Sequence, residues 1–436
     1  MARRSLALLA LLACLVLAGC TAGSAAPTPA RSVSSSAGNG PATLRLAVYG
    51  DRPMLSAYRR VAAAYTARHP DITVTVEIQG TEDSALTRLD TQFDSGDPPD
   101  LFETDRDELP ALVARQRVQP VDELLEARGV LFGDNFQRLG LEAMSAQSAL
   151  QCMPVDVSPL VVYYNTTLVH PSQLALSGQP APNPIDGWTW AQFSRAAHQS
   201  VVGLAHGVYL PARLDLLTAM VRSAGGDTMD DPRQPTTLTL TDSRATIRQI
   251  LRLARSPHLG FSQRQDPVSA FEQGDLGMIV GRRDLVPRLR AGHVPFDVLP
   301  LPSLGTPVTI ADTSGLCLAR TGHHIDASAD FLAFATGPDG ARILAHSGEV
   351  VPANLPTLNS AAFGQPGREP AHGEVFVEAV RRAQSMPFSA QWPDLDAQVQ
   401  PLLEGLFSDP RVDPSMLLAQ LDALSATLLA PPTPSA

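Results

Sequence analysis

The chain has 436 residues, a formal net charge of −11 at pH 7 and a hydrophobic content of 44%. Every basic residue is an arginine, and no basic cluster lies on a predicted helix, which argues against nucleic acid as a partner. The length exceeds what one ordinary hydrophobic core supports, so two domains are expected.

The N-terminal residues have the pattern of an export signal. Arg3 and Arg4 precede an apolar run at 6–17, which is too short to span a bilayer as a mature helix. The run ends in Leu-Ala-Gly-Cys, which is similar to the bacterial lipobox. That similarity implies a lipoprotein signal peptide at 1–19 and lipidation of Cys20.

Residues 20–41 begin with this cysteine and are otherwise rich in Ser, Ala, Pro, Thr and Gly. Such a composition has almost nothing to bury and predicts a flexible tether. We therefore expect the folded part to start near Ala42, outside the cytoplasm and anchored to the cell membrane by an N-terminal lipid.

The next part of the chain alternates between strand and helix patterns. Strands are predicted where polar and apolar residues alternate, and helices where apolar residues recur at helical spacing. The order predicts a largely parallel sheet with helices on both faces. The predicted strands are 43–49, 72–78 and 100–103, and the predicted helices are 56–69, 83–95 and 107–115.

Polar residues follow the first and third of these strands. In open α/β sheets ligands bind at the carboxyl ends of the strands, which makes Tyr49, Asp51, Asp105 and Arg106 candidate ligand-binding residues. An aspartate just before a helix is also a common helix cap, and this alternative stands for both aspartates.

A proline-containing apolar stretch at 151–165 separates this unit from a second one. Pro154 and Pro159 remove backbone donors, so we predict two short extended pieces that meet at a bend. We interpret this stretch as a hinge between two α/β units.

The order of motifs along the chain resembles the extracellular solute-binding proteins of carbohydrate-importing ABC transporters, the family that includes maltose-binding protein. The motifs are HPDITVTVE, GDPPDLFET, DRDELPALVARQRVQPVDELL, PVDVSPLVVYYN and IDGWTWAQF. The resemblance implies a periplasmic-binding-protein fold, with two α/β lobes, a hinge and a ligand cleft. We expect the N-terminal lobe at 42–155 and 317–364 and the C-terminal lobe at 156–316 and 365–430.

The same resemblance implies several ligand contacts. It places the pair Asp105 and Arg106 on sugar hydroxyls, and Ser158 where maltose-binding protein has a carboxylate. Of the adjacent residues Tyr163 and Tyr164, one is expected to pack inside the second lobe and one to face the cleft, and Tyr164 is the candidate. Tyr209 is expected at the start of a helix predicted over 207–222.

Further candidates lie in the second half of the chain. The stretch AFEQGDLGMIVGRRD resembles a family signature before a ligand-facing loop, which implicates Gly281, Arg282 and Asp284. Arg283 lies between the last two, and guanidinium groups bind phosphate, carboxylate or vicinal hydroxyls. The alternative is that Arg282, Arg283 and Asp284 cap a helix and point into solvent. The resemblance to the return crossing at 312–318 implicates Ser314.

The tryptophans divide into two groups. Trp188 and Trp190 match a structural helix start, and we expect them in the core. Trp392 lies near the usual C-terminal binding loop, where its ring could stack on a pyranose, or could instead seat the last helix.

The resembled fold brings Cys152 and Cys317 onto neighbouring strands beside the two hinge crossings. Export favours a disulfide between them. The alternative is two small buried hydrophobic residues.

No catalytic motif and no histidine pair at metal spacing occurs in the sequence, so no enzyme activity, metal or cofactor is expected. The predicted function is capture of a small saccharide or derivative and its delivery to an ABC permease, by a monomer. The alternatives are an amino sugar, sugar phosphate or glycerophosphodiester as ligand, or a lipid-anchored glycan-processing enzyme.

Overall fold

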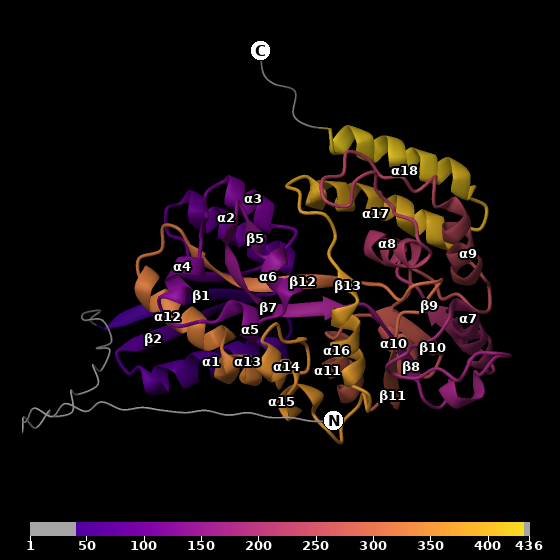
Figure 1. Ribbon diagram of the computed structural model, residues 1–436, viewed down its shortest axis with the longest axis horizontal. Coiled ribbons are helices and arrows are strands. Elements are labelled where there is room, and N and C mark those ends of the chain that lie inside the picture. Colours follow the sequence, from indigo (N-terminus) through magenta and orange to yellow (C-terminus); the bar gives the residue numbers. More distant parts are fainter. Residues whose placement is uncertain (1–40, 431–436) are drawn as a thin grey trace, which may run out of the picture. The chain divides into compact units, whose positions relative to one another are not determined.

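The computed structural model describes residues 41–430 (Figure 1). The chain divides into a unit at 1–39 and a unit at 40–436, and the second carries all the described elements. The predicted signal peptide, Cys20 and nearly all of the predicted tether lie outside the described residues. Within 41–430, no helix combines the length and apolar character needed to cross a membrane.

The first sheet is mixed. Strands β2, β1 and β3 are parallel, as the sequence predicted, with β2 at one edge. β12 joins β3 antiparallel and continues the sheet to β13. The short β4 and the longer β7 also pair with β12. The strands are β1 (Ala42–Tyr49), β2 (Ile72–Gln79), β3 (Leu101–Asp105), β4 (Val118–Gln119), β7 (Cys152–Pro159), β12 (Thr309–Ala319) and β13 (Ala383–Gln384).

Helices surround this sheet, and they pack through apolar residues at helical spacing. Tyr58, Val61 and Tyr65 of α1 are buried in one cluster with Leu44 and Leu46 of β1. A two-stranded hairpin of β5 (Ser145–Ala146) and β6 (Ala149–Leu150) precedes β7. The helices are α1 (Arg52–Arg68), α2 (Glu82–Asp94), α3 (Leu109–Ala114), α4 (Asp122–Glu126), α5 (Phe132–Asn135), α6 (Arg138–Ala143), α12 (Ile325–Thr336) and α13 (Pro338–Ala345).

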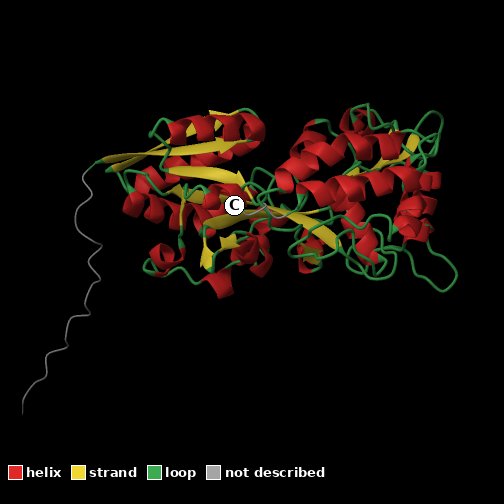
Figure 2. Cartoon of the chain, turned by 90° about the horizontal axis from the view of Figure 1, so that it is seen from above, coloured by secondary structure: helices red, strands yellow, loops and turns green. Residues whose placement is uncertain are grey.

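The second sheet has four strands in the order β11, β8, β10, β9, and in both sheets the strands lie among helices (Figure 2). Its strands are β8 (Val161–Asn165), β9 (His206–Tyr209), β10 (Leu276–Gly281) and β11 (Phe296–Pro300). Its helices are η1 (Pro171–Gln173), α7 (Trp190–Gln199), α8 (Leu214–Ser223), α9 (Arg244–Ala254), α10 (Pro267–Glu272), α11 (Leu285–Ala291), α14 (Leu355–Leu358), α15 (Ala361–Gly364), α16 (Glu374–Arg381), α17 (Trp392–Ser408) and α18 (Pro414–Leu428).

The helix predicted over 207–222 is wrong in its first part. Residues 206–209 form β9, which pairs parallel with β10, and α8 begins only at Leu214. Pro211 explains the difference, because the residue before a proline is disfavoured in helical conformation. Gly207 also requires close approach, since a Cβ there would lie 2.7 Å from the carbonyl oxygen of Ala197.

Two hydrophobic clusters cover the two faces of the second sheet. Trp188 and Trp190 belong to one of them, which confirms their predicted place in the core. The other contains Val161 and Tyr163 of β8 together with Leu358 and Phe363. The last two residues lie inside the range expected for the N-terminal lobe, and they pack in one cluster with β8.

The two extended pieces predicted around Pro159 are confirmed as β7 and β8, separated by Leu160. β7 runs beside β12 from the first sheet towards the second (Figure 1), with Asp312 opposite Ser158 and Ser314 opposite Asp156. We call these two paired strands the β7–β12 ribbon. It is the crossing that the hinge interpretation required.

The bridge expected between Cys152 and Cys317 is present in the structure. The two residues face each other in the register of the β7–β12 ribbon, with their Cα atoms 4.3 Å apart and both side chains fully buried. The disulfide therefore joins the two strands at the end of the ribbon that lies in the first sheet.

Candidate functional site

A cavity of about 370 Å³ lies where the carboxyl ends of β1 and β3 meet the β7–β12 ribbon and the loop after β10. We call it the central cavity. Its lining residues are mostly polar or charged. They are Tyr49, Gly50, Asp51, Asp105, Asp156, Ser158, Arg282, Asp284, Asp312, Thr313, Ser314 and Glu349.

The β7–β12 ribbon supplies one wall of the central cavity. Side chains two residues apart on a strand lie on the same face, so Asp156 and Ser158 of β7 share a face. The antiparallel register places Ser314 and Asp312 of β12 directly opposite them. Four polar side chains are therefore grouped on one face of two paired strands.

The central cavity is crowded with acidic groups. Burial raises the pKa of the Asp105 carboxyl well above its usual range, and the neighbouring Asp312 and Glu82 raise it further. Burial likewise raises the pKa of Asp156, although the backbone N–H of Val351 opposes this by donating to its Oδ1 at 2.6 Å. These carboxyl groups are buried, and the central cavity has more acidic than basic side chains in its lining.

Arg282 is the basic residue that lines the central cavity, and its guanidinium already makes hydrogen bonds within the protein. Nη2 donates to Asp215 Oδ2 at 2.6 Å, while Nη1 donates to the carbonyl oxygens of Ser158 at 2.5 Å and Ile310 at 3.3 Å. Asp312 lies farther away, with 4.0 Å between its Oδ2 and Arg282 Nε. Arg282 thus links the end of β10 to both strands of the ribbon.

A second, small cavity of about 30 Å³ shares Arg282 and Asp312 with the central cavity. Here arginines alternate with carboxylates, and burial with the nearby Asp312 raises the pKa of Asp107 to about 7. The lining residues are Arg106, Asp107, Arg213, Leu214, Asp215, Arg282, Ile310, Ala311, Asp312, Met386, Trp392 and Asp396.

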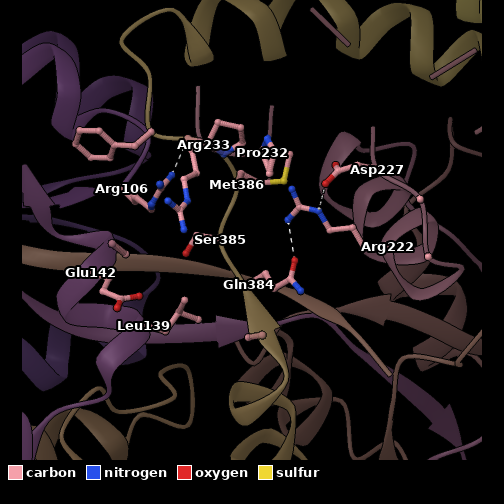
Figure 3. Close-up of a pocket in the computed structure, with 16 residues that line it drawn as sticks. Arg106, Leu139, Glu142, Arg222, Asp227, Pro232, Arg233, Gln384, Ser385 and Met386 are labelled. Atoms are coloured by element: carbon pink, nitrogen blue, oxygen red, sulfur yellow. Dashed lines mark hydrogen bonds and ion pairs between the residues drawn. The ribbon is translucent and has the colours of Figure 1, made fainter. Parts of the chain in front are cut away.

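A third cavity, the large cavity of about 760 Å³, shares Arg106 and Met386 with the small one (Figure 3). Arg106 donates from Nη1 to the carbonyl oxygen of Pro387 at 2.8 Å. Arg222 is held between Asp227 and Gln384, at 3.1 and 3.0 Å. Neighbouring cavities of this set thus share lining residues, but the small cavity between the other two has a volume of only about 30 Å³.

Most of the predicted ligand-binding residues lie on these cavities. Arg106 and Trp392 line the small cavity. Those that line the central cavity are Tyr49, Asp51, Asp105, Ser158, Arg282, Asp284 and Ser314. Asp51 and Asp284 each precede a helix, α1 and α11, but neither side chain makes a capping hydrogen bond.

Three predicted residues do not line any of the three cavities. Tyr164 is 7% exposed, packs in the core and donates its hydroxyl to Asp297 Oδ2 at 3.5 Å. Tyr209 packs edge-on against Phe261. Gly281 packs against α11, where a Cβ would lie 2.4 Å from the end of the Leu285 side chain.

The aromatic and basic candidates are more deeply buried than a ligand-stacking role requires. Trp392 is 2% exposed and belongs to the core, so it seats the start of α17 and leaves no open ring face for stacking. Arg283 is 1% exposed and lies over the rings of Phe363 and Phe376, where burial lowers its pKa to about 10. It does not point into solvent, in contrast to the capping alternative.

Three carboxylates of the central cavity were missed from the sequence. Asp156 and Asp312 each stand two residues before a predicted serine, so strand alternation alone could have found them. Glu349 lies in a turn after α13, and no local sequence pattern predicts that it lines the cavity. No group of His, Cys, Asp and Glu within 41–430 is arranged to hold a metal ion.

Comparison with solved structures shows the same fold. An ABC substrate-binding protein of Listeria monocytogenes, solved with cycloalternan, superposes with a TM-score of 0.76 at 16% identity over 88% of this chain and 98% of that one. The GacH receptor of Streptomyces glaucescens, solved unliganded and with acarbose, gives 0.74 at 17% identity over 89% and 98%. A sugar-binding protein MalE of Xanthomonas citri gives 0.75 at 15% identity over 89% and 98%.

At the level of sequence, the chain is similar to an uncharacterized lipoprotein of Streptomyces antibioticus, 26% identical over 227 residues and 51% of this chain. The match spans 45% of that relative, about half of its length. The family model described as bacterial extracellular solute-binding protein matches residues 52–342, which is more than half of the chain. The chain therefore belongs to the bacterial extracellular solute-binding proteins, which are binding proteins and not enzymes.

Proposed function

We propose that this protein captures a small saccharide or saccharide derivative in the central cavity and delivers it to the permease of an ABC importer. The observation that carries the proposal is the row of polar side chains on the β7–β12 ribbon, which faces the carboxyl ends of β1 and β3. Hydroxyl and carboxylate groups on a rigid wall suit the hydroxyls of a sugar.

The ligands of structurally similar proteins support this class of solute. Those proteins were solved with cycloalternan, acarbose and maltotriose. The central cavity and the large cavity, of about 370 and 760 Å³, each have room for a small saccharide.

The binding cycle follows from the position of the hinge. The β7–β12 ribbon runs between the two sheets, and Arg282 reaches its strands from the end of β10. A solute in the central cavity touches groups from both sheets, so it stabilises the state in which they are drawn together. We further propose that the protein acts as a monomer, held outside the cell membrane by a lipid on Cys20 and the tether that follows.

The proposal is tested by titrating the purified protein with mono- to trisaccharides, with a thermal shift as the readout and small-angle scattering to follow compaction. A solute at about 100 times its dissociation constant stabilises the folded state by about 2.7 kcal/mol. Asp105→Asn should weaken the solute at least about tenfold, whereas Glu126→Gln, an exposed change at the end of α4, should not. If no saccharide binds, or if binding causes no compaction, the proposal is wrong.

A further inference from the structure

We propose that the solute carries a protonated amine, which the carboxylates of the central cavity surround. This inference rests on the proposed function and narrows it to amine-bearing saccharides. Its basis is the charge of the cavity wall together with a buried carboxylate oxygen that has no partner.

The first argument is the imbalance of charge. The central cavity is lined by six carboxylates and one guanidinium. That guanidinium, Arg282, already donates to Asp215, Ser158 and Ile310. The carboxylates that line the central cavity are Asp51, Asp105, Asp156, Asp284, Asp312 and Glu349.

The second argument concerns unpartnered polar atoms of residues that line the central cavity. Oε1 of Glu349 is buried and has no hydrogen-bond partner within residues 41–430. Thr313 is fully buried, and its Oγ1 likewise has no partner in that range.

A buried acceptor without a donor destabilises the folded state, and more so when it is charged. A bound ammonium group supplies several donors and a compensating charge in one step. A neutral hydroxyl supplies a single donor and no charge, so it would leave most of this imbalance in place.

The pKa values point the same way. Burial raises the pKa of Glu349 to about 7, and repulsion from Asp51 and Asp284 contributes. An ammonium ion favours the charged form of this carboxyl and so lowers its pKa on binding. By linkage, affinity for the amine rises with pH up to about 7, and falls again once the amine loses its proton.

The other charged or titratable groups around the central cavity are consistent with this pH dependence of the affinity. Burial and Asp105 keep the pKa of the Tyr49 hydroxyl well above its usual value, so it stays neutral. Glu82 of α2 faces Asp105 and adds negative charge. The acidic groups therefore come from the loop between β1 and α1, from α2, β3 and the β7–β12 ribbon, and from the loop after β10 and the turn after α13.

Two other ligand chemistries fit less well. A sugar phosphate would bring like charge against the carboxylates, which raises its free energy of binding. A metal ion needs ligands grouped within coordination distance, and no such group exists within residues 41–430. An organic cation can be contacted by several carboxylates that are too far apart to bind one metal ion. It therefore agrees with the excess of acidic residues and with the lack of a metal-binding group among the described residues.

The test uses matched saccharides that differ in one substituent, namely cellobiose, the corresponding disaccharide of glucosamine, and its N-acetylated form, with the matching mono- and trisaccharides and with spermidine as a non-sugar amine. Affinities are measured by calorimetry between about pH 5 and pH 8. The aminated sugars should bind at least about tenfold tighter than their neutral partners. Their affinity should pass through a maximum, while that of any neutral sugar stays flat.

Matched variants complete the test. Glu349→Gln and Asp312→Asn keep shape but remove charge, and each should weaken the aminated sugar at least about tenfold, while Glu126→Gln leaves affinity unchanged. If neutral or N-acetylated sugars bind as tightly as the amine, the inference is overturned and the proposed function stands. If spermidine binds and no saccharide does, the amine is supported and the saccharide is overturned. If nothing in the panel binds, both are overturned.

Discussion

Arg282 Nη2 and Asp215 Oδ2 lie 2.6 Å apart and tie the end of β10 to the first turn of α8. Both side chains are largely buried, at 18% and 7% exposure. The Arg282 guanidinium also donates to backbone carbonyls of β7 and β12. The carboxylate of Asp215 therefore helps to hold Arg282 in the position from which it contacts both strands. The pair therefore fixes one wall of the central cavity before any solute arrives.

Removing one member of this pair should be costly. Asp215→Asn leaves Arg282 without its charged partner, and breaking a buried pair in this way costs on the order of 3–5 kcal/mol. Chemical denaturation should show this loss of unfolding free energy. The exposed pair Arg138 and Glu142 serves as the control, because Arg138→Ala should leave stability unchanged within error. Equal effects of the two changes would contradict the role given to Asp215.

Trp392→Ala should act on stability, because the ring is 2% exposed and packs in the core. Truncating a buried tryptophan costs about 3–5 kcal/mol, and Trp392→Phe should cost less since it retains part of the ring. Leu204→Ala, at a side chain that is 93% exposed, is the matched control and should be neutral. A variant that folds as stably as the parent but loses its solute would restore the stacking role to Trp392.

The disulfide should be found in the exported protein. Mass spectrometry of a non-reduced digest should recover the peptides of Cys152 and Cys317 as one linked species. It closes a loop of 165 residues, for which the chain-entropy model gives about 5 kcal/mol, an upper figure since structure in the unfolded chain reduces it. Reductant should lower the melting temperature of the parent and leave that of a double Cys→Ala variant unchanged. Free thiols on both peptides would contradict the bridge.

Stability should depend on pH through Glu349. Burial raises its pKa from an ordinary 4.5 to about 7, so between these values the folded state holds a proton that the unfolded state releases. Stability from this group is therefore complete below 4.5 and is lost as pH rises towards 7. In the absence of solute, Glu349→Gln should raise stability more at about pH 8 than at about pH 5. An equal change at both pH values would show that Glu349 has an ordinary pKa.

Much of the fold could be predicted because its signals are local. Alternation of polar and apolar residues predicted β1 and β2, and helical spacing predicted α1. Pro159 ends β7 just before β8, whereas Pro154 lies inside β7. β9 was missed because its strand pairing is with β10, far along the chain, and the pattern after Gly207 looks helical on its own.

The site was predicted only in part, for a related reason. Asp105 and Ser158 follow from strand ends and alternation, but which tyrosine of the pair Tyr163 and Tyr164 faces inward depends on packing partners. In the structure both are buried, one on each face of β8, with the Tyr163 hydroxyl donating to the Arg282 carbonyl at 2.5 Å. Glu349 reaches the cavity by tertiary folding alone.

The disulfide has a consequence for how the protein moves. It clamps the β7–β12 ribbon at Cys152 and Cys317, and Gly315 packs tightly there, since a Cβ would lie 2.7 Å from the Met153 carbonyl oxygen. Bending is thereby confined to the free length of the ribbon, from Asp156 to Leu160 and across the facing strand. Those residues also carry the polar side chains of the central cavity. Under the proposed function, a solute bound there contacts the hinge directly, so the same few residues of the ribbon would set both the lifetime of the complex and the stiffness of the hinge.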